Sequence, residues 1–237
     1  MAFNKEVFTT RAITAIFFVA VMLIGLLWNE VSFFALVMLI HAGCWVEYEK
    51  IIAGFRRPLL YTIFGIVYIS VSWALFLDLQ VSFPFYPLGP TSTPAIHWFP
   101  IFTIACMWIN DTMAYLVGSF IGKTPFSKIS PKKTWEGTLG GVLLTVLVLG
   151  WTASNFFDQL MPAGLSTAVP SMHWYILALL AAIAGTAGDL LESKFKRRAG
   201  VKDSGTILPG HGGYLDRFDS LLVATPMVWI YLRVVVF

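Results

Sequence analysis

Long runs of apolar residues constrain this chain more than any other feature. A bilayer core about 30 Å thick needs roughly 20 mainly apolar residues per helix, and about 17 is the practical minimum. The runs that meet or approach this length are Ala12–Trp28, Val31–Val46, Leu59–Leu77, Trp98–Phe120, Thr138–Phe157, Trp174–Leu191 and Phe218–Phe237. Only 12% of the residues are charged, about half the fraction of an average soluble domain. The sequence therefore predicts an all-α integral membrane protein with about seven transmembrane helices.

The basic residues predict how the chain is oriented in the membrane. Of 16 Lys and Arg residues, all but Arg233 lie before the first run or in the loops after the second, fourth and sixth runs. The other loops, at 29–30, 78–97 and 158–173, contain no Lys or Arg. Basic residues are enriched in cytoplasmic loops, so we expect the N-terminus on the cytoplasmic side. The net charge of +3 is too small to suggest nucleic-acid binding.

One carboxylate lies within a predicted span. Asp111 is about midway along the fourth apolar run, where a charge costs several kcal/mol unless it is paired or faces water. This position makes Asp111 a candidate for a place near a functional site. A structural hydrogen bond to a neighbouring helix is the alternative, and the sequence alone leaves it open.

The loop after the fourth run, GKTPFSKISPKKTWEGTLGG at 122–141, combines lysines with hydroxyl groups. Lysines beside a membrane often reflect only topology or attraction to anionic lipids. Here Lys132, Lys133 and Thr134 stand just before an expected helix start, an arrangement that suits phosphate oxygens. The loop is not a P-loop, because the G-x-x-x-x-G-K-[ST] pattern does not occur in it.

The loop at 189–219 combines acidic residues, basic residues and glycines. If the sixth helix continues past the membrane surface, Asp189, Ser193 and Lys196 lie on one of its faces, because they are spaced four and three residues apart. Glycines on both sides of His211 allow backbone N–H groups to approach a ligand closely. One surface would then offer a carboxylate, a hydroxyl group, an ammonium group and backbone donors.

The same loop ends with two aspartates at the start of the last helix. Asp216 and Asp219 are three residues apart and share a helix face. Oxygen ligands from Asp189 and Asp216 suit Mg²⁺, which typically takes one or two carboxylates and leaves its other positions to water and substrate phosphates. A solvated network of ion pairs is the alternative, but it explains neither the aspartates at helix ends nor the glycine-rich segment. The residues fit phosphoryl or nucleotidyl transfer at a membrane surface.

Two motifs resemble those of a known enzyme family. The segment Ser193–Asp219, SKFKRRAGVKDSGTILPGHGGYLDRFD, resembles the signature of the phosphatidate cytidylyltransferases, also called CDP-diacylglycerol synthases. Every fixed position of that signature matches, and the one departure is Tyr214, where an aliphatic residue is usual. The segment Asp111–Gly141, with DTMAY and SPKKTWEGTLGG, resembles the second conserved stretch of the family.

The resemblance implies a reaction and its requirements. A phosphate oxygen of phosphatidic acid would attack the α-phosphorus of CTP, giving CDP-diacylglycerol and pyrophosphate in phospholipid biosynthesis. The resemblance also implies Mg²⁺ dependence, allows K⁺ beside the Mg²⁺, and implies a homodimer in the inner (cytoplasmic) membrane. The basic loops place the expected active site on the cytoplasmic side. The expected organisation is then N-terminal transmembrane helices at 1–97 and a catalytic membrane domain at 98–237, with cytoplasmic loops at 121–137 and 189–219.

The resemblance also assigns roles to individual residues. It places metal binding on Asp189 and Asp216, with Asp219 beside them in the catalytic group. It places phosphate contacts on Ser193, Lys196, Arg197, Lys202 and Arg217. His211 is a polar member of the site with no claim as a general base, because a phosphate dianion is already nucleophilic.

Two other classes of function remain open from the sequence. A CTP-dependent lipid kinase can use the same metal chemistry, but the spacing of the K-D and H-G-G-Y-L-D-R-F-D elements favours the cytidylyltransferase. A transporter or channel would spread its polar residues along several spans. Here they concentrate in the predicted cytoplasmic loops, which favours an enzyme.

Overall fold

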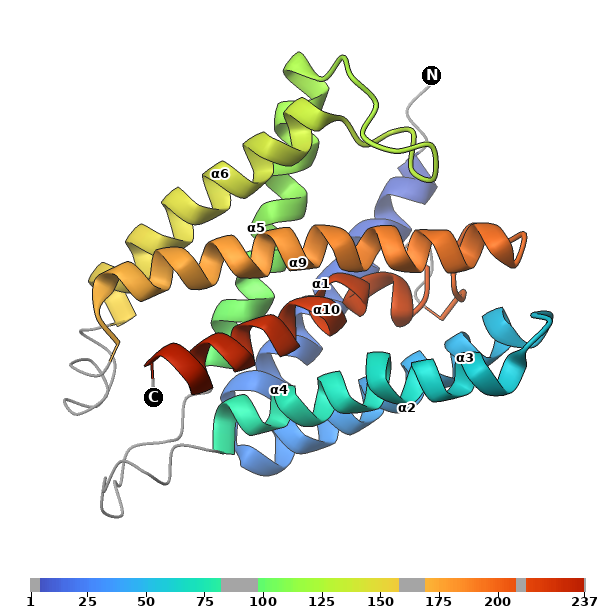
Figure 1. Cartoon of the computed structure of the whole chain (residues 1–237), viewed down its shortest axis with the longest axis horizontal. Coiled ribbons are helices and arrows are strands. Elements are labelled where there is room, and N and C mark those ends of the chain that lie inside the picture. Colours follow the sequence, from blue (N-terminus) through green and yellow to red (C-terminus); the bar gives the residue numbers. More distant parts are fainter. Residues whose placement is uncertain (1–4, 82–97, 158–168, 208–211, 237) are drawn as a thin grey trace.

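A computed structural model describes residues 5–81, 98–157, 169–207 and 212–236. Within this part of the chain the structure is helical and has no strand. The α-helices are α1 (Lys5–Leu27), α2 (Glu30–Ile52), α3 (Pro58–Gly65), α4 (Ser72–Val81), α5 (Trp98–Ile121), α6 (Trp135–Thr152), α9 (Ser171–Arg198) and α10 (Leu215–Tyr231). Short π-helical segments continue three of them: η1 (Ile66–Val71), η2 (Ala153–Phe157) and η3 (Leu232–Val236). Figure 1 shows the arrangement.

Six helical stretches in the described residues are long and apolar enough to cross a membrane. They are Glu30–Ile52, Pro58–Leu79, Trp98–Ile121, Trp135–Phe156, Ser171–Arg198 and Leu215–Val236. These stretches confirm six of the predicted spans, while the first predicted span corresponds to a shorter apolar stretch, Ile13–Leu27. Large apolar side chains such as Leu59, Val67 and Phe120 are exposed on the helix surfaces, as expected where hydrocarbon replaces water.

Polar residues at the helix ends determine where two of the helices begin. Asn29 accepts a hydrogen bond from the backbone N–H of Ser32 (2.8 Å), and the Ser32 hydroxyl accepts one from the N–H of Asn29 (3.0 Å). This capping box satisfies two N–H groups that the first turn of α2 leaves free. Thr134 caps α6 by accepting a hydrogen bond from Gly137 N–H (3.1 Å). The helix start expected after Lys132 and Lys133 is therefore confirmed.

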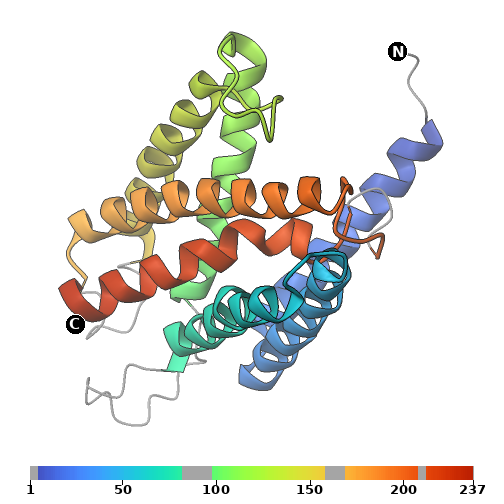
Figure 2. The ribbon, with the colours of Figure 1, turned by 45° about the vertical axis from the view of Figure 1, so that its right-hand side comes forward.

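The helices form three neighbouring groups. α9 and α10 run side by side across the middle of the molecule, the α5–α6 hairpin lies on one side of them, and α2 with α3–α4 lies on the other (Figures 1 and 2). Glycines allow close contact within and between these groups: a Cβ at Gly188 would collide with the backbone of Asp219, and a Cβ at Gly137 would meet the backbone of α5. Close backbone approach through small residues is typical of membrane helices.

α2 contacts the start of α10 through a glycine. The ring of Tyr214 lies directly against Gly43, so that a Cβ at Gly43 would overlap the ring. Tyr214 is the one position at which the chain departs from the expected signature. The aromatic ring is accommodated because its neighbour on α2 has no side chain.

Arg233, the basic residue that departs from the charge pattern, is paired within the structure. Its guanidinium donates a hydrogen bond to Asp78 (2.8 Å), which also accepts one from the indole N–H of Trp229 (2.6 Å). The guanidinium carbon lies 5.7 Å from the centre of the Trp229 ring. Charged residues within membrane-spanning helices are usually paired in this way.

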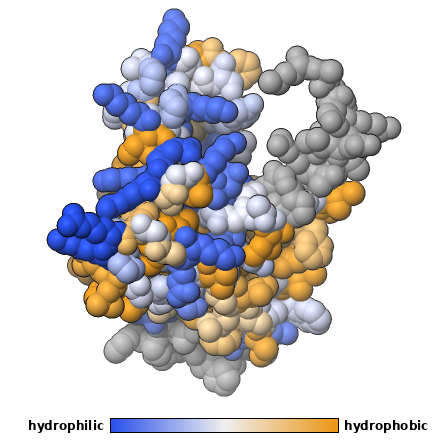
Figure 3. Space-filling view, turned by 90° about the vertical axis from the view of Figure 1, so that its right-hand side faces the viewer, coloured by the Kyte–Doolittle hydropathy of each residue, from blue (hydrophilic) through white to orange (hydrophobic). Residues whose placement is uncertain are grey.

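Hydrophilic side chains gather on the end of the molecule where α9 ends and where α2 turns into α3 (Figure 3). This end also carries the start of α10 and the loop before α6 (Figure 1). Both predicted catalytic loops therefore lie toward one end of the helical bundle.

Candidate active site

A cavity of about 600 Å³ lies between α5, α6, α9 and α10. The expected site residues that line it are Asp111, Lys132, Lys133, Thr134, Asp189, Asp216 and Asp219. They come from helices and loops that are far apart in the sequence. The cavity brings Asp111 beside the other predicted site residues, although it lies within an apolar helix.

Three carboxylates gather beside this cavity, and two of them, Asp189 and Asp219, line it. Asp189, Glu192 and Asp219 each place a carboxylate oxygen so that the three oxygens lie within 4.8 Å of one another. Ser193 donates a long hydrogen bond to Asp189 (3.4 Å), which confirms that these two residues share a face of α9. Both oxygens of Glu192 are buried without a hydrogen bond in the described residues, although one contacts the ammonium of Lys196. Such a group of hard oxygen atoms suits a divalent cation.

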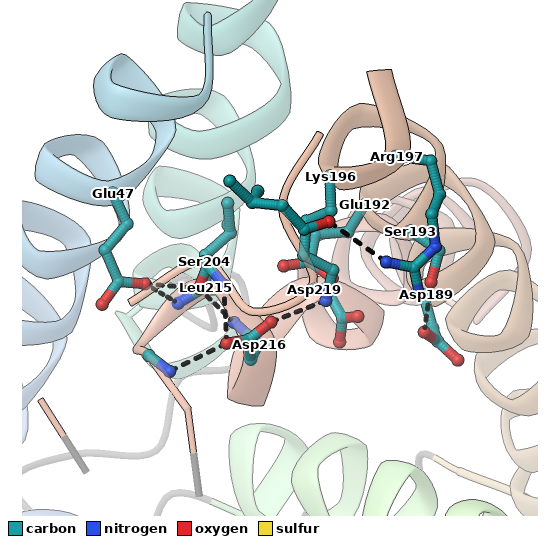
Figure 4. Close-up of polar contacts among 12 residues, drawn as sticks. Glu47, Asp189, Glu192, Ser193, Lys196, Arg197, Ser204, Leu215, Asp216 and Asp219 are labelled. Atoms are coloured by element: carbon teal, nitrogen blue, oxygen red, sulfur yellow. Dashed lines mark hydrogen bonds and ion pairs between the residues drawn. The ribbon is translucent and has the colours of Figure 1, made fainter. Parts of the chain in front are cut away.

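Lys196 connects two of the acidic side chains. Its ammonium contacts Glu192, one helical turn earlier on α9, and donates a hydrogen bond to Asp216 Oδ1 (2.6 Å) at the start of α10. Glu192 is fully buried and the Asp216 side chain is only 7% exposed. Lys196 therefore neutralises carboxylates that water reaches poorly (Figure 4).

The orientation of Asp216 is fixed by further hydrogen bonds. Its Oδ2 accepts from the backbone N–H groups of Gly213 (2.8 Å) and Ser204 (2.9 Å). Its own N–H donates to the Ser204 hydroxyl (3.2 Å). Asp216 is thus held between Lys196 and the loop, and it lines the cavity beside the three clustered carboxylates.

The loop before α6 brings a cation to the same wall. The Lys133 ammonium forms an ion pair with Asp189. Burial lowers the pKa of Lys133 below its ordinary value, while the nearby carboxylates of Asp111 and Asp219 oppose that shift. Lys132 lines the cavity with its side chain exposed. The two lysines predicted to contact phosphate therefore line the same cavity as Asp189 and Asp219.

The remaining predicted residues lie elsewhere. Arg197 is exposed and donates a hydrogen bond to the backbone carbonyl of Val201 (3.1 Å). Lys202 is also exposed, and neither residue lines the cavity. Arg217 lines a smaller neighbouring cavity of about 190 Å³, which shares Asp111, Asp216 and Asp219 with the larger one and extends to α1. His211 lies outside the described residues.

The sequence patterns did not identify two buried glutamates beside the site, Glu192 and Glu47. Glu192 is three residues after Asp189 on α9, and this spacing on one helix face was a signal that could have identified it. Glu47 lies on α2 and contacts the loop before α10. Its partners are remote in the sequence, and the only signal was an acidic residue directly after an apolar run.

Comparison with known proteins gives a consistent result. The model of a family described as the cytidylyltransferase family matches residues 60–235. A phosphatidate cytidylyltransferase of Staphylococcus aureus (strain COL) is 35% identical over 201 residues, which cover 81% of this chain and 73% of that protein. One from a Synechocystis species is 40% identical over 145 residues, 60% of this chain and 45% of that protein. One from Rickettsia bellii is 27% identical over 223 residues, 92% of this chain and 88% of that protein.

Proposed function

Because this chain belongs to the cytidylyltransferase family, we propose that it is a membrane enzyme that converts CTP and phosphatidic acid to CDP-diacylglycerol and pyrophosphate. The observation that carries the proposal is the cavity between α5, α6, α9 and α10, where two lysines lie beside an acidic cluster. The whole cavity lies within the segment that matches the family. Relatives named phosphatidate cytidylyltransferase align with most of the chain.

The donor atoms in the cavity fit Mg²⁺. Asp189 and Asp219 offer carboxylate oxygens, and the buried oxygens of Glu192 lack hydrogen bonds in the described residues. Asp216 stays in the proposed ligand set with Asp189, because both line the same space. When bound, Mg²⁺ would neutralise triphosphate charge and polarise the reacting phosphoryl group. The family resemblance adds K⁺ as a second proposed cation.

The basic residues of the chain would bind and orient the two phosphate groups. Lys132 and Lys133 line the cavity, where an ammonium group can contact the oxygens of the triphosphate as a point charge. A phosphate oxygen of the lipid attacks the α-phosphorus of CTP, a P–O bond forms, and the bond to pyrophosphate breaks. Catalysis of this kind depends mostly on positioning and on charge stabilisation. Arg217, at the smaller cavity, is the proposed contact for the lipid phosphate.

We further propose that the site faces the cytoplasm. The basic loops and the hydrophilic end of the bundle support this orientation (Figure 3), since basic residues accumulate on the cytoplasmic side. CTP then reaches the cavity from the cytoplasm, and phosphatidic acid reaches it from the inner leaflet. Residence in the inner membrane and assembly as a homodimer are proposals that rest on the family resemblance.

A labelling experiment tests the reaction and separates it from that of a lipid kinase. Purified protein is incubated with phosphatidic acid, Mg²⁺ and CTP labelled with ³²P at either the α- or the γ-phosphate. We expect label from α-labelled CTP in a lipid product and γ-label only in pyrophosphate. Lipid labelled from the γ-phosphate would instead identify a kinase. Asp189→Asn is the matched inactive control, because it removes one carboxylate charge without changing the side-chain size.

A further inference from the structure

Glu47 is a carboxylate buried at the junction between α2 and the loop before α10. It is 1% exposed, and a buried carboxylate is costly unless hydrogen bonds compensate for the lost water. Its Oε1 accepts from Tyr214 N–H (3.0 Å), and its Oε2 accepts from Leu215 N–H (2.9 Å) and from the Ser204 hydroxyl (2.6 Å). Three donors from the loop and the helix start therefore converge on one side chain.

Glu47 supplies the N-terminal cap that α10 does not provide for itself. The residue at the cap position, Tyr214, makes no capping hydrogen bond with its own side chain. The first N–H groups of a helix need acceptors, and a negative charge there is favourable because of the helix dipole. The carboxylate of Glu47 meets both needs from another helix.

The hydrogen bonds continue from Glu47 to the site. The Ser204 hydroxyl donates to Glu47 and accepts from the N–H of Asp216, while the Ser204 N–H donates to the Asp216 carboxylate. Asp216 in turn holds Lys196. Figure 4 shows Glu47 on one side of Asp216, and the acidic side chains of α9 on the other.

The surrounding loop leaves room only for this carboxylate. A Cβ added at Gly205 or at Gly213 would collide with the Glu47 carboxylate. Neither glycine has a positive φ, so the close approach of Glu47, and not backbone conformation, explains why a side chain is excluded at these positions. The described parts of the loop, on either side of 208–211, therefore fit closely around Glu47.

We propose that Glu47 is a positioning residue, which caps α10 from α2 and, through Ser204, holds Asp216 and Lys196 in their places in the cavity. Glu47 does not line the cavity and has no role in contacting substrate. The expected effect on catalysis rests on the proposed function, in which Asp216 is a metal ligand. Glu47 also lies outside the segment that matches the family, so the site depends on a helix that the match does not include.

The test compares Glu47→Gln with a matched control, Glu49→Gln, an exposed position on the same helix. Glutamine keeps the size but offers one acceptor oxygen in place of two. We expect kcat to fall roughly 10–100-fold, as for other residues that orient site ligands, with KM for CTP changed less than about twofold because binding contacts persist. The control should match the wild type.

Hydrogen exchange measured by mass spectrometry gives a readout that needs no substrate. In Glu47→Gln we expect peptides covering 212–220 to exchange at least about tenfold faster, because only one acceptor oxygen remains for the N–H groups of Tyr214 and Leu215. Peptides from α6 should be unchanged. Hydrogen exchange tests the positioning role of Glu47 whether or not the enzyme is active. If the wild type makes no CDP-diacylglycerol, that failure refutes the proposed reaction and leaves the positioning role to be decided by the exchange rates.

A second variant separates the two parts of the inference. Ser204→Ala keeps the hydrogen bonds that Tyr214 and Leu215 donate to Glu47, and the one from the backbone N–H of residue 204 to Asp216. It removes only the hydroxyl, which links Glu47 to the N–H of Asp216. We expect a loss in kcat of at least about fivefold, since the hydroxyl makes two hydrogen bonds and one alone is worth about that factor. Exchange at Tyr214 and Leu215 should stay near the wild-type rate. Wild-type kcat and exchange in Glu47→Gln, or wild-type kcat in Ser204→Ala, would overturn the proposal. If Glu47→Gln does not fold, Ser204→Ala decides the outcome.

Discussion

Replacing Lys196 with methionine removes the ammonium that lies between two buried carboxylates and keeps an unbranched side chain. Glu192 is fully buried and the Asp216 side chain is 7% exposed, so both lose their cationic partner where water is scarce. Removal of one partner from a buried ion pair costs about 3–5 kcal/mol. Asp216 lines a cavity of about 600 Å³ that can admit water. We therefore expect Lys196→Met to lower the free energy of unfolding by about 3 kcal/mol, the lower end of that range.

Unfolding in detergent micelles, measured for Lys196→Met, Glu192→Gln and the double variant, tests this magnitude. Glu192→Gln removes a charge that Lys196 neutralises, so the double variant should recover at least about 1 kcal/mol relative to the sum of the single effects. Lys194→Met, an exposed position on the same helix, is the control and should change stability by less than about 0.5 kcal/mol. Additive losses, or a Lys196→Met effect as small as that of the control, would refute the reasoning.

Three other predictions concern the metal ligands, the cap of α6 and the orientation. Asp189→Asn and Asp216→Asn should each lower kcat by at least about a hundredfold while the protein still inserts, and near-normal turnover of both at saturating Mg²⁺ would exclude them as ligands. Thr134→Ala should lower the free energy of unfolding by about 1 kcal/mol, whereas Thr134→Ser, which keeps the hydroxyl that Gly137 N–H bonds to, should not. In a background without the two native cysteines, a membrane-impermeant thiol reagent should label Asp189→Cys only from the cytoplasmic side and Asn29→Cys only from outside. The reverse pattern would contradict the proposed orientation.

The sequence predicted those parts of the site that depend on helix periodicity. Asp189 and Ser193 share a face because four residues make slightly more than one turn, and their hydrogen bond confirms it. The apolar runs likewise predicted the spans, because length and hydropathy decide whether a helix can cross a bilayer. The Ile13–Leu27 stretch is shorter than the six candidate spans, because polar and charged residues precede it in α1.

Helix periodicity and hydropathy did not predict the contacts between segments that are far apart in the sequence. Ser204 and Glu47 are 157 residues apart in the chain, and no periodicity relates a loop residue to a residue of α2. The ion pair of Lys133 with Asp189 depends in the same way on how α6 packs against α9. Arg197 matched the family signature, but its bond to Val201 closes the end of α9, a local preference that spacing alone does not reveal.

The contact between Gly43 and Tyr214 makes the choice of residue at one position depend on the other. An aromatic ring at position 214 requires glycine at position 43, because any Cβ at 43 would overlap the ring. A smaller aliphatic residue at 214 would leave room for alanine at 43. In an alignment of many relatives, the two columns should therefore vary together. A chimera that joins the N-terminal helices of one relative to the remaining helices of another should fold only when the two residues come from compatible parents.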